Sequence, residues 1–217
     1  MSEGCSGGSC STCPGGSGSD GEDRLPPGML EHYDLNTDTR KGILVFIQTE
    51  DGVPDASTAG ILTLARNISD DRVFATAFGG VEIKERFKEI FALGVDTLYH
   101  MRNRDRGYRP LPWASAIMEV AERVNAAVLL FPDTRAGEEL ASLCAAKADA
   151  GICVRCMDLR MENGTMAAKK DLDTGTIGVR FVSRPAVIVA SSTGLPAPVS
   201  DPGRKGTVIN RPYSLEE

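Results

Sequence analysis

Three of the six cysteines lie close together near the N-terminus and have a spacing that suits metal chemistry. Cys5, Cys10 and Cys13 follow the pattern C-x4-C-x2-C, which matches the first three ligands of a plant-type 2Fe–2S cluster. Such a cluster needs a fourth ligand, and so does a tetrahedral zinc ion. The spacing predicts candidate ligands for an iron–sulfur cluster or zinc, with a metal-free or redox-active segment as the alternative.

The other three cysteines lie far along the chain and favour a structural interpretation. Cys153 and Cys156 form a C-x-x-C pair within a stretch that has the pattern of a strand. Positions three apart on a strand point to opposite faces, so we expect the two thiols to diverge. Cys144 falls on the apolar face of a predicted helix, where a free thiol packs as a small hydrophobic group. We expect all three to be structural and reduced.

A second candidate for chemistry is the loop that runs from Phe131 to Gly137. It ends an apolar strand and opens a helix, so free backbone N–H groups are expected there. Together with the Thr134 hydroxyl and the Arg135 charge, these groups could hold a phosphate or a partner carboxylate. We therefore predict cofactor contacts at Thr134, Arg135 and Gly137. The alternative is an ordinary helix start in which Thr134 is only the N-cap.

The histidines and carboxylates give no pattern typical of a hydrolase. The chain has two histidines, His32 and His100, and a catalytic triad would have to rest on His100. His100 ends a predicted strand and pairs with no nucleophile in the sequence pattern, so we interpret it as structural. We predict no catalytic residues and no hydrolase, and this pattern leaves open whether the chain is an enzyme.

The elements that position these residues begin at Gly42. Apolar β-branched runs alternate with segments of helical periodicity, in the order βαβαβαβα, with four strands near residues 43–47, 73–78, 95–101 and 126–131. This alternation predicts a parallel sheet covered by helices on both faces, which is a three-layer α/β fold. Strand-like stretches without helices follow near 151–161, 164–170, 176–182 and 185–191, which predicts an antiparallel addition at the sheet edge.

Ligands of such sheets bind beyond the carboxyl ends of the strands, near the point where the strand order reverses. That rule directs attention to four loops at residues 48–51, 79–80, 100–106 and 133–137. No GxGxxG motif follows the first strand, and no GxxxxGK[ST] motif occurs anywhere in the chain. Classical dinucleotide and P-loop sites are therefore disfavoured.

Charge and composition limit the partners. Residues 1–38 carry seven acids and one base, which accounts for the net charge of −6, so residues 39–217 carry 23 of each sign. A neutral body with an acidic tail is a poor candidate for binding nucleic acid. No apolar stretch approaches the roughly 18 residues of a membrane span, so membrane insertion is not expected. The N-terminus lacks a signal-peptide pattern, which favours a cytoplasmic protein.

The domain organisation follows from composition. Residues 1–41 begin with a stretch rich in Gly, Ser and Cys, which is typical of a disordered tail. Residues 42–196 contain the regular α/β pattern. Residues 197–217 are rich in Pro, Gly and charge and are expected to form a C-terminal extension.

Several motifs of the body resemble the electron transfer flavoprotein alpha subunit family. The opening strand and its loop read GILVFIQTEDG from Gly42, and Ala65-Arg66 matches a helix pair of that family. The family's pattern L-F-x-x-T-x-x-G-x-x-L-A is matched from Leu130 to Ala141. The resemblance covers about residues 42–196 and implies the alpha N-terminal domain, with a three-layer parallel sheet of the adenine-nucleotide-hydrolase-like type. Ser191 stands where the family often has an arginine, and no counterpart of the FAD-binding C-terminal domain follows Pro196.

The resemblance implies a docking scaffold rather than a chain that binds flavin alone. In that family the alpha N-terminal domain and the beta subunit form a base beneath a mobile FAD domain. It therefore implies a beta-like partner subunit, AMP on that partner, and FAD in the assembled complex, supplied by a partner chain or an oxidoreductase. The alternatives are a stand-alone nucleotide-binding or regulatory domain, and an iron–sulfur or zinc carrier that acts through the cysteine tail.

Overall fold

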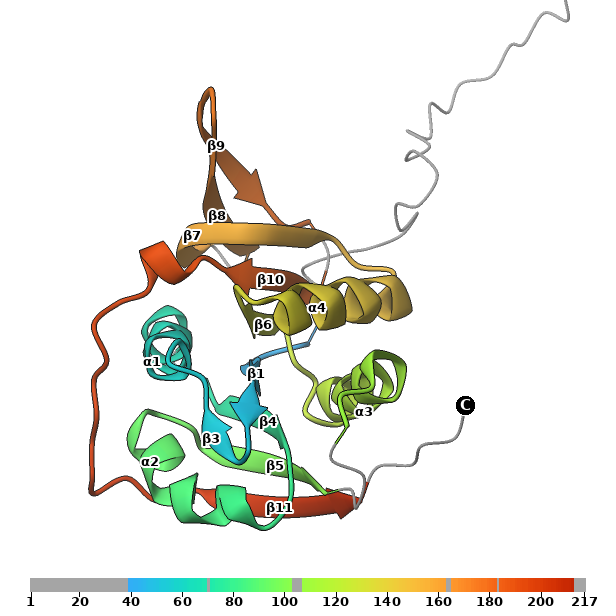
Figure 1. Ribbon diagram of the computed structural model, residues 1–217. Coiled ribbons are helices and arrows are strands. Elements are labelled where there is room, and N and C mark those ends of the chain that lie inside the picture. Colours follow the sequence, from blue (N-terminus) through green and yellow to red (C-terminus); the bar gives the residue numbers. More distant parts are fainter. Residues whose placement is uncertain (1–38, 70, 103–106, 163–164, 183, 213–217) are drawn as a thin grey trace, which may run out of the picture. The chain divides into compact units, whose positions relative to one another are not determined.

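The computed structural model describes residues 39–69, 71–102, 107–162, 165–182 and 184–212. Most of the predicted tail therefore lies outside the described residues, and so do Cys5, Cys10, Cys13 and His32. The described part forms one large mixed sheet with helices on both faces, which confirms the predicted fold class (Figure 1).

The sheet has nine strands in the order β11-β5-β4-β1-β6-β10-β7-β8-β9. All neighbouring pairs are parallel except β7 with β8 and β8 with β9. The bounds of the strands are β1 Ile43–Ile47, β4 Val73–Phe78, β5 Thr97–Arg102, β6 Val128–Pro132, β7 Ile152–Glu162, β8 Thr165–Leu172, β9 Gly175–Arg180, β10 Ala186–Ala190 and β11 Thr207–Pro212. A separate two-stranded ribbon pairs β2 (Thr49–Glu50) with β3 (Val53–Pro54).

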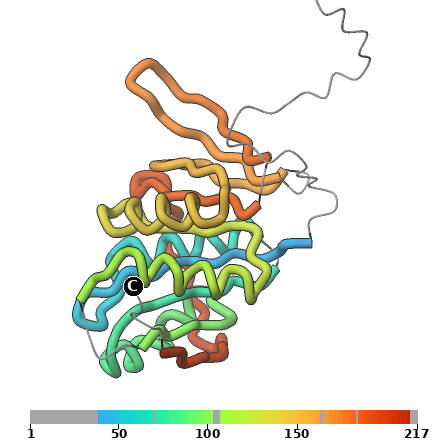
Figure 2. The backbone as a smooth tube through the Cα atoms, turned by 90° about the vertical axis from the view of Figure 1, so that its right-hand side faces the viewer, coloured from blue at the N-terminus to red at the C-terminus, as the bar shows by residue number. Residues whose placement is uncertain are grey.

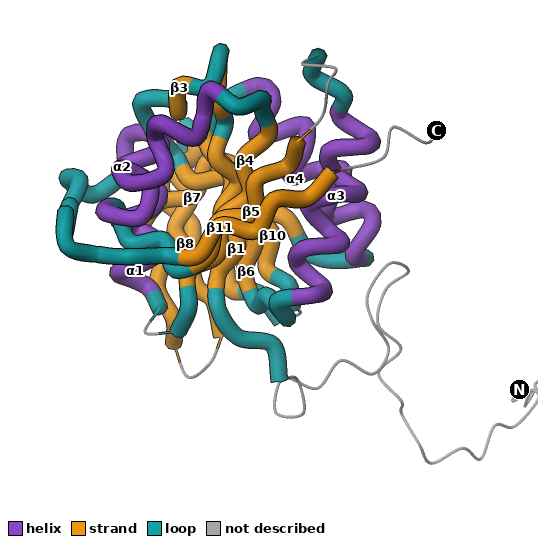
Figure 3. Tube along the Cα trace, turned by 90° about the horizontal axis from the view of Figure 1, so that it is seen from below, coloured by secondary structure: helices purple, strands orange, loops and turns teal. Residues whose placement is uncertain are grey.

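The helices cover the two faces of the sheet in pairs. Figure 3 shows α1 and α2 on one side of the strands and α3 and α4 on the other. Two separate apolar clusters result, one on each face of the sheet. The helices are α1 (Thr58–Ile68), α2 (Phe87–Ala92), which directly follows the 3-10 helix η1 (Glu82–Arg86), α3 (Pro110–Arg123) and α4 (Arg135–Ala148); the short 3-10 helix η2 is Ser192–Gly194.

The central strands form because they are apolar at every position. The sequences of β1, β6 and β10 are ILVFI, VLLFP and AVIVA, and every residue of the three is buried. Strands that are covered on both faces by helices read as continuous hydrophobic runs, whereas half-exposed strands alternate. These three strands therefore lie side by side in the middle of the sheet, as the register of β1 with β6 and of β6 with β10 shows.

The chain beyond Pro196 contributes a strand that the sequence did not predict. Figure 1 shows it running past α1 and α2 to the far edge of the sheet, where β11 pairs with β5 along its whole length. The ion pairs of Asp96 hold this segment: its carboxylate accepts hydrogen bonds from Arg66 (2.5 Å) and Arg204 (2.7 Å). The N–H of Val73 donates to the same carboxylate at 2.9 Å.

Replacing Asp96 by Asn should destabilise the domain by about 1–3 kcal/mol, because two arginines lose a charged partner. Burial alone would raise the Asp96 pKa, but the hydrogen bonds from Arg204, Val73 and Arg66 outweigh it and hold the pKa below the ordinary 3.8. A carboxyl group whose pKa is lowered by folding stabilises the protein above about pH 4. This stabilisation is lost as the pH falls through the pKa of the folded state.

Urea unfolding at pH 7 and at pH 3 tests this prediction. The difference in unfolding free energy between wild type and Asp96→Asn should have its whole value of about 1–3 kcal/mol at pH 7 and a smaller value at pH 3. Asp173→Asn, which changes an exposed aspartate in the turn after β8, is the matched control. An equal difference at both pH values would contradict the assigned role of the carboxylate.

Candidate functional site

The strand order reverses between β1 and β6, and the loops that leave these two strands meet there. From β1 the chain adds β4 and β5 on one side and then crosses to β6 on the other. Gln48 follows β1, and Thr134 follows β6. The Thr134 hydroxyl donates to the Gln48 side-chain oxygen at 2.5 Å. Two of the four predicted loops are thus joined at the carboxyl edge of the sheet, where open α/β sheets bind ligands.

The start of α4 has the capping geometry expected from its sequence. The Thr134 hydroxyl accepts from the N–H of Gly137 at 3.0 Å, and the Thr134 N–H donates to the Pro132 carbonyl at 2.9 Å. A Cβ atom on Gly137 would lie 2.1 Å from that carbonyl oxygen, so only glycine fits. The predicted N-cap role of Thr134 is confirmed, and the close approach of the helix to the strand end explains Gly137.

Two N–H groups in the first turn of α4 remain available for an anion. Among the hydrogen bonds of the described residues, none involves the N–H of Arg135 or of Ala136. Thr134 and Gly137 already satisfy each other. The Arg135 side chain is exposed. A phosphate at this point would therefore meet the two free N–H groups and the Arg135 guanidinium.

The charges around this helix start cancel. Arg155, in β7, reaches Asp133 and Glu138, with distances of 3.3 Å from its Nε atom to a carboxylate oxygen of each. With Arg135, the group has two positive and two negative side chains. The site offers backbone dipoles rather than net positive charge to a bound anion.

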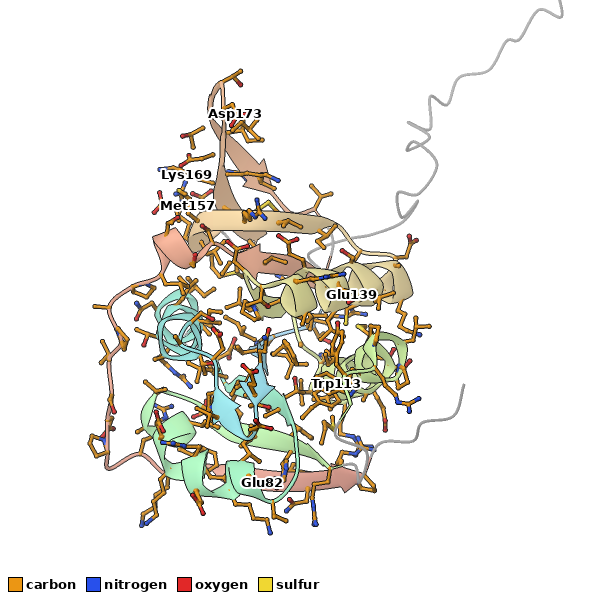
Figure 4. All side chains as sticks on the ribbon, in the orientation of Figure 1. Glu82, Trp113, Glu139, Met157, Lys169 and Asp173 are labelled. Carbon is orange, nitrogen blue, oxygen red and sulfur yellow. A yellow bond between two sulfur atoms is a disulfide. The ribbon has the colours of Figure 1, made fainter. Side chains whose placement is uncertain are left out.

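An aromatic wall lies beside the site, between α3 and the sheet. Trp113 stacks on Phe78, with ring centres 4.1 Å apart, and meets Tyr108 edge-on at 5.2 Å. The Tyr108 hydroxyl donates to Glu139 of α4 at 3.0 Å. Partial burial and this contact with Glu139 raise the pKa of Tyr108. Figure 4 labels Trp113 and Glu139 at the two helices that flank the wall.

His100 has the structural role that the sequence predicted. It is completely buried, and its ring nitrogens lie 3.0 Å from the Asn210 side-chain oxygen and 3.1 Å from the Gly79 carbonyl. The ring thus connects the loop after β4 with the edge strand β11. The predicted loop at residues 79–80 therefore contacts His100 through the Gly79 carbonyl. Both of its residues are glycines, which supply no nucleophile or base.

The expectation for the C-x-x-C pair was wrong. Cys153 and Cys156 are joined as a disulfide with an S–S distance of 2.11 Å. A β-bulge explains this: Cys153 pairs with Ile188 and Cys156 with Ala190, so three steps on β7 match two on β10. Arg155 takes up the extra residue with a φ of +56°. The bulge brings both sulfur atoms to the same face, which simple alternation does not predict.

The remaining body cysteine behaves as predicted. Cys144 is a buried free thiol in the cluster beneath α3 and α4, and burial raises its pKa to about 12. Within the described ranges, no group of three or more His, Cys, Asp or Glu side chains could hold a metal ion. The predicted metal ligands Cys5, Cys10 and Cys13 lie outside these ranges.

Comparison with protein-family models matches residues 43–215 to the electron transfer flavoprotein domain. The chain belongs to the electron transfer flavoprotein domain family. The match includes the capped start of α4 and extends through β11, the strand that the sequence pattern did not indicate. No curated protein matches the chain. Within the described residues, no helix of this family member is long and apolar enough to cross a membrane.

The sequence predicts Thr134, Arg135 and Gly137 as site residues, and the structure places all three in the first turn of α4 or at its cap. The sequence also points to the loop after β1, but it does not single out Gln48 within that loop. Tyr108 and Glu139 were missed as well. The strand order supplies the signal for Gln48, because it places β1 directly beside β6.

Replacing Gly137 by Ala should destabilise the domain by about 1–3 kcal/mol, because a buried Cβ would overlap backbone that cannot move freely. Gly178→Ala is the matched control, since nothing lies within 4 Å of a Cβ at that position. Thermal or urea unfolding of both variants measures the difference. Equal stability of Gly137→Ala and wild type would contradict the described geometry of the helix start.

Proposed function

We propose that this chain is a docking subunit of a flavin-dependent electron-transfer complex, and that it works with a beta-like partner subunit. The observation that carries the proposal is the match of residues 43–215 to the electron transfer flavoprotein domain. The chain supplies a scaffold rather than catalytic residues. FAD belongs to the assembled complex, on a partner chain or on the oxidoreductase that the complex serves, and AMP belongs to the beta-like partner.

The sheet of β7, β8 and β9 supports docking because its apolar face continues outward from the core. The buried Met166 and Ala168 of β8 belong to the cluster beneath α1 and α2. Ala168 pairs with Val179 and Lys170 with Ile177, so alternate residues toward the turn lie on this same face. Figure 2 shows that the β8–β9 hairpin extends away from the helices that cover the rest of the sheet.

This face carries Lys170, opposite Ile177, and three exposed apolar side chains, which we call the apolar strip. They are Met161 (39% exposed), Leu172 (44%) and Ile177 (45%). Exposed apolar groups that continue from a core are typical of a protein–protein contact. A partner that covers the strip would remove this surface from water.

The opposite face of the same sheet carries charged pairs that are already satisfied. Lys169 contacts Asp158 at 2.6 Å, and Glu162 contacts both Arg160 (2.5 Å) and Arg180 (3.0 Å). The hydrogen bonds from Arg160 and Arg180 lower the pKa of Glu162. This face is suited to solvent, so the apolar strip is the face we assign to the partner.

Leu172→Asp should weaken association with the beta-like partner by about tenfold or more, because it places a charge in an apolar contact. Leu111→Asp is the matched control: Leu111 is 61% exposed on α3, away from the strip. Co-purification and equilibrium titration of the two subunits measure the effect, and circular dichroism checks the fold. Equal affinity of the two variants would contradict docking through the strip.

A second candidate function, nucleotide binding without a redox partner, is favoured by one observation. The N–H groups of Arg135 and Ala136, which have no hydrogen-bond partner among the described residues, lie at the switch point of the sheet, and the start of a helix is a common phosphate position. Under this proposal Thr134 and Gly137 hold the helix start rigid, and Arg135 contacts the phosphate. The tail cysteines Cys5, Cys10 and Cys13 remain a separate prediction for an iron–sulfur cluster or zinc.

Titration with AMP tests this second candidate. AMP should raise the unfolding temperature of the isolated chain by mass action, and Arg135→Ala should weaken its binding severalfold. Arg123→Ala, an exposed arginine at the other end of the neighbouring helix α3, is the control. If AMP leaves the unfolding temperatures of the wild-type chain and of both variants unchanged, nucleotide binding at α4 is contradicted. The docking proposal is unaffected by that result.

A further inference from the structure

A cationic groove lies at the opposite end of the sheet from the candidate site. It has a volume of about 540 Å³ and is formed where three neighbouring strands begin. Arg72 precedes β4, Asp96 precedes β5, and Lys205 lies two residues before β11. Arg66, near the end of α1, completes the wall. Three segments far apart in the sequence therefore contribute charged side chains to one groove.

The groove has an excess of positive charge. Among the described residues that line it, the cations are Arg66, Arg72 and Lys205, and the carboxylates are Asp71 and Asp96. One positive charge remains after these are balanced. Arg204 lies on the C-terminal segment that also carries Lys205, and it contacts Asp96 at 2.7 Å.

The exposed cations of the groove are available to a ligand. The side chains of Arg72 and Lys205 are exposed, and neither forms an ion pair with any residue in the described part of the chain. The two more buried arginines share a single carboxylate: Arg66 contacts one Asp96 oxygen at 2.5 Å and Arg204 the other at 2.7 Å.

Each of these two half-buried arginines keeps one unpaired donor, although Arg66 also donates to the carbonyls of Asp71 (3.1 Å) and Gly94 (2.6 Å). The Nε atoms of Arg66 and Arg204 are buried and have no hydrogen-bond partner among the described residues. Most buried polar groups in folded proteins are paired, so two unpaired guanidinium donors beside one groove indicate a shortage of acceptor oxygens. Phosphate supplies several acceptor oxygens, and arginine binds it in a fork geometry.

We propose that this groove binds a compact dianion of the phosphate class, either inorganic phosphate or a phosphate monoester. Arg72 and Lys205 contact the anion directly, and the Arg66–Asp96–Arg204 arrangement holds the floor of the groove. Because Lys205 belongs to the segment that leads into β11, the bound anion ties this edge strand to the body of the sheet. The site is independent of partner docking through the apolar strip.

The test is calorimetric titration of the full chain at pH 7.5 with inorganic phosphate, at an ionic strength kept constant with chloride. A parallel titration with phenyl phosphate distinguishes a monoester from the free ion. The variant Arg72→Ala/Lys205→Ala should bind at least about tenfold more weakly, because two charge-assisted contacts are lost. The control Arg123→Ala/Lys147→Ala removes the same charge from α3 and α4 and should bind like wild type.

Hydrogen exchange gives a second measurement that does not depend on the heat of binding. Phosphate should slow amide exchange in β11 of wild type and leave β11 of Arg72→Ala/Lys205→Ala unchanged. Equal phosphate affinity in the two double variants would overturn the proposal. So would binding of poly-glutamate without binding of phosphate, which would indicate an acidic polypeptide as the ligand.

Discussion

Burial of β1, β6 and β10 on both faces is the constraint on which the rest of the structure depends. All of their residues are buried, so helices must cover the sheet from both sides. A parallel sheet covered in this way is built by right-handed crossovers, and the chain must reverse direction within the sheet to place two helices on each face. The reversal lies between β1 and β6, and it creates the meeting point of Gln48 and Thr134.

The same constraint separates the molecule into parts with different tasks. The helix-covered strands provide a rigid support whose carboxyl edge holds the candidate site. The strands β8 and β9 lie with the end of β7 at the edge of the sheet, beyond the cover of α1 and α4, and there the apolar face continues into the exposed strip of Met161, Leu172 and Ile177. The docking role that we propose needs such a surface, and the opposite face is occupied by internal ion pairs.

Much of the fold could be predicted from the sequence because the signals are local. Strand-like runs that alternate with segments of helical periodicity predict the parallel sheet, and Thr134 and Gly137 indicate where α4 begins. Three features could not be predicted in this way. The bulge at Arg155 breaks the two-residue period and reverses the expected orientation of Cys156. The strand β11 is mostly exposed and is fixed by the contact of Arg204 with Asp96, 108 residues away. The pairing of Gln48 with Thr134 depends on strand order.

A visible absorption spectrum, with flavin analysis, of the chain isolated under anaerobic conditions together with its native partners shows whether the domain works in a flavin-dependent complex. We expect flavin bands in a hetero-oligomer that contains a second electron transfer flavoprotein subunit of the beta kind. A colourless preparation in which the chain is alone would contradict the assignment of this domain to a flavin-dependent electron-transfer complex.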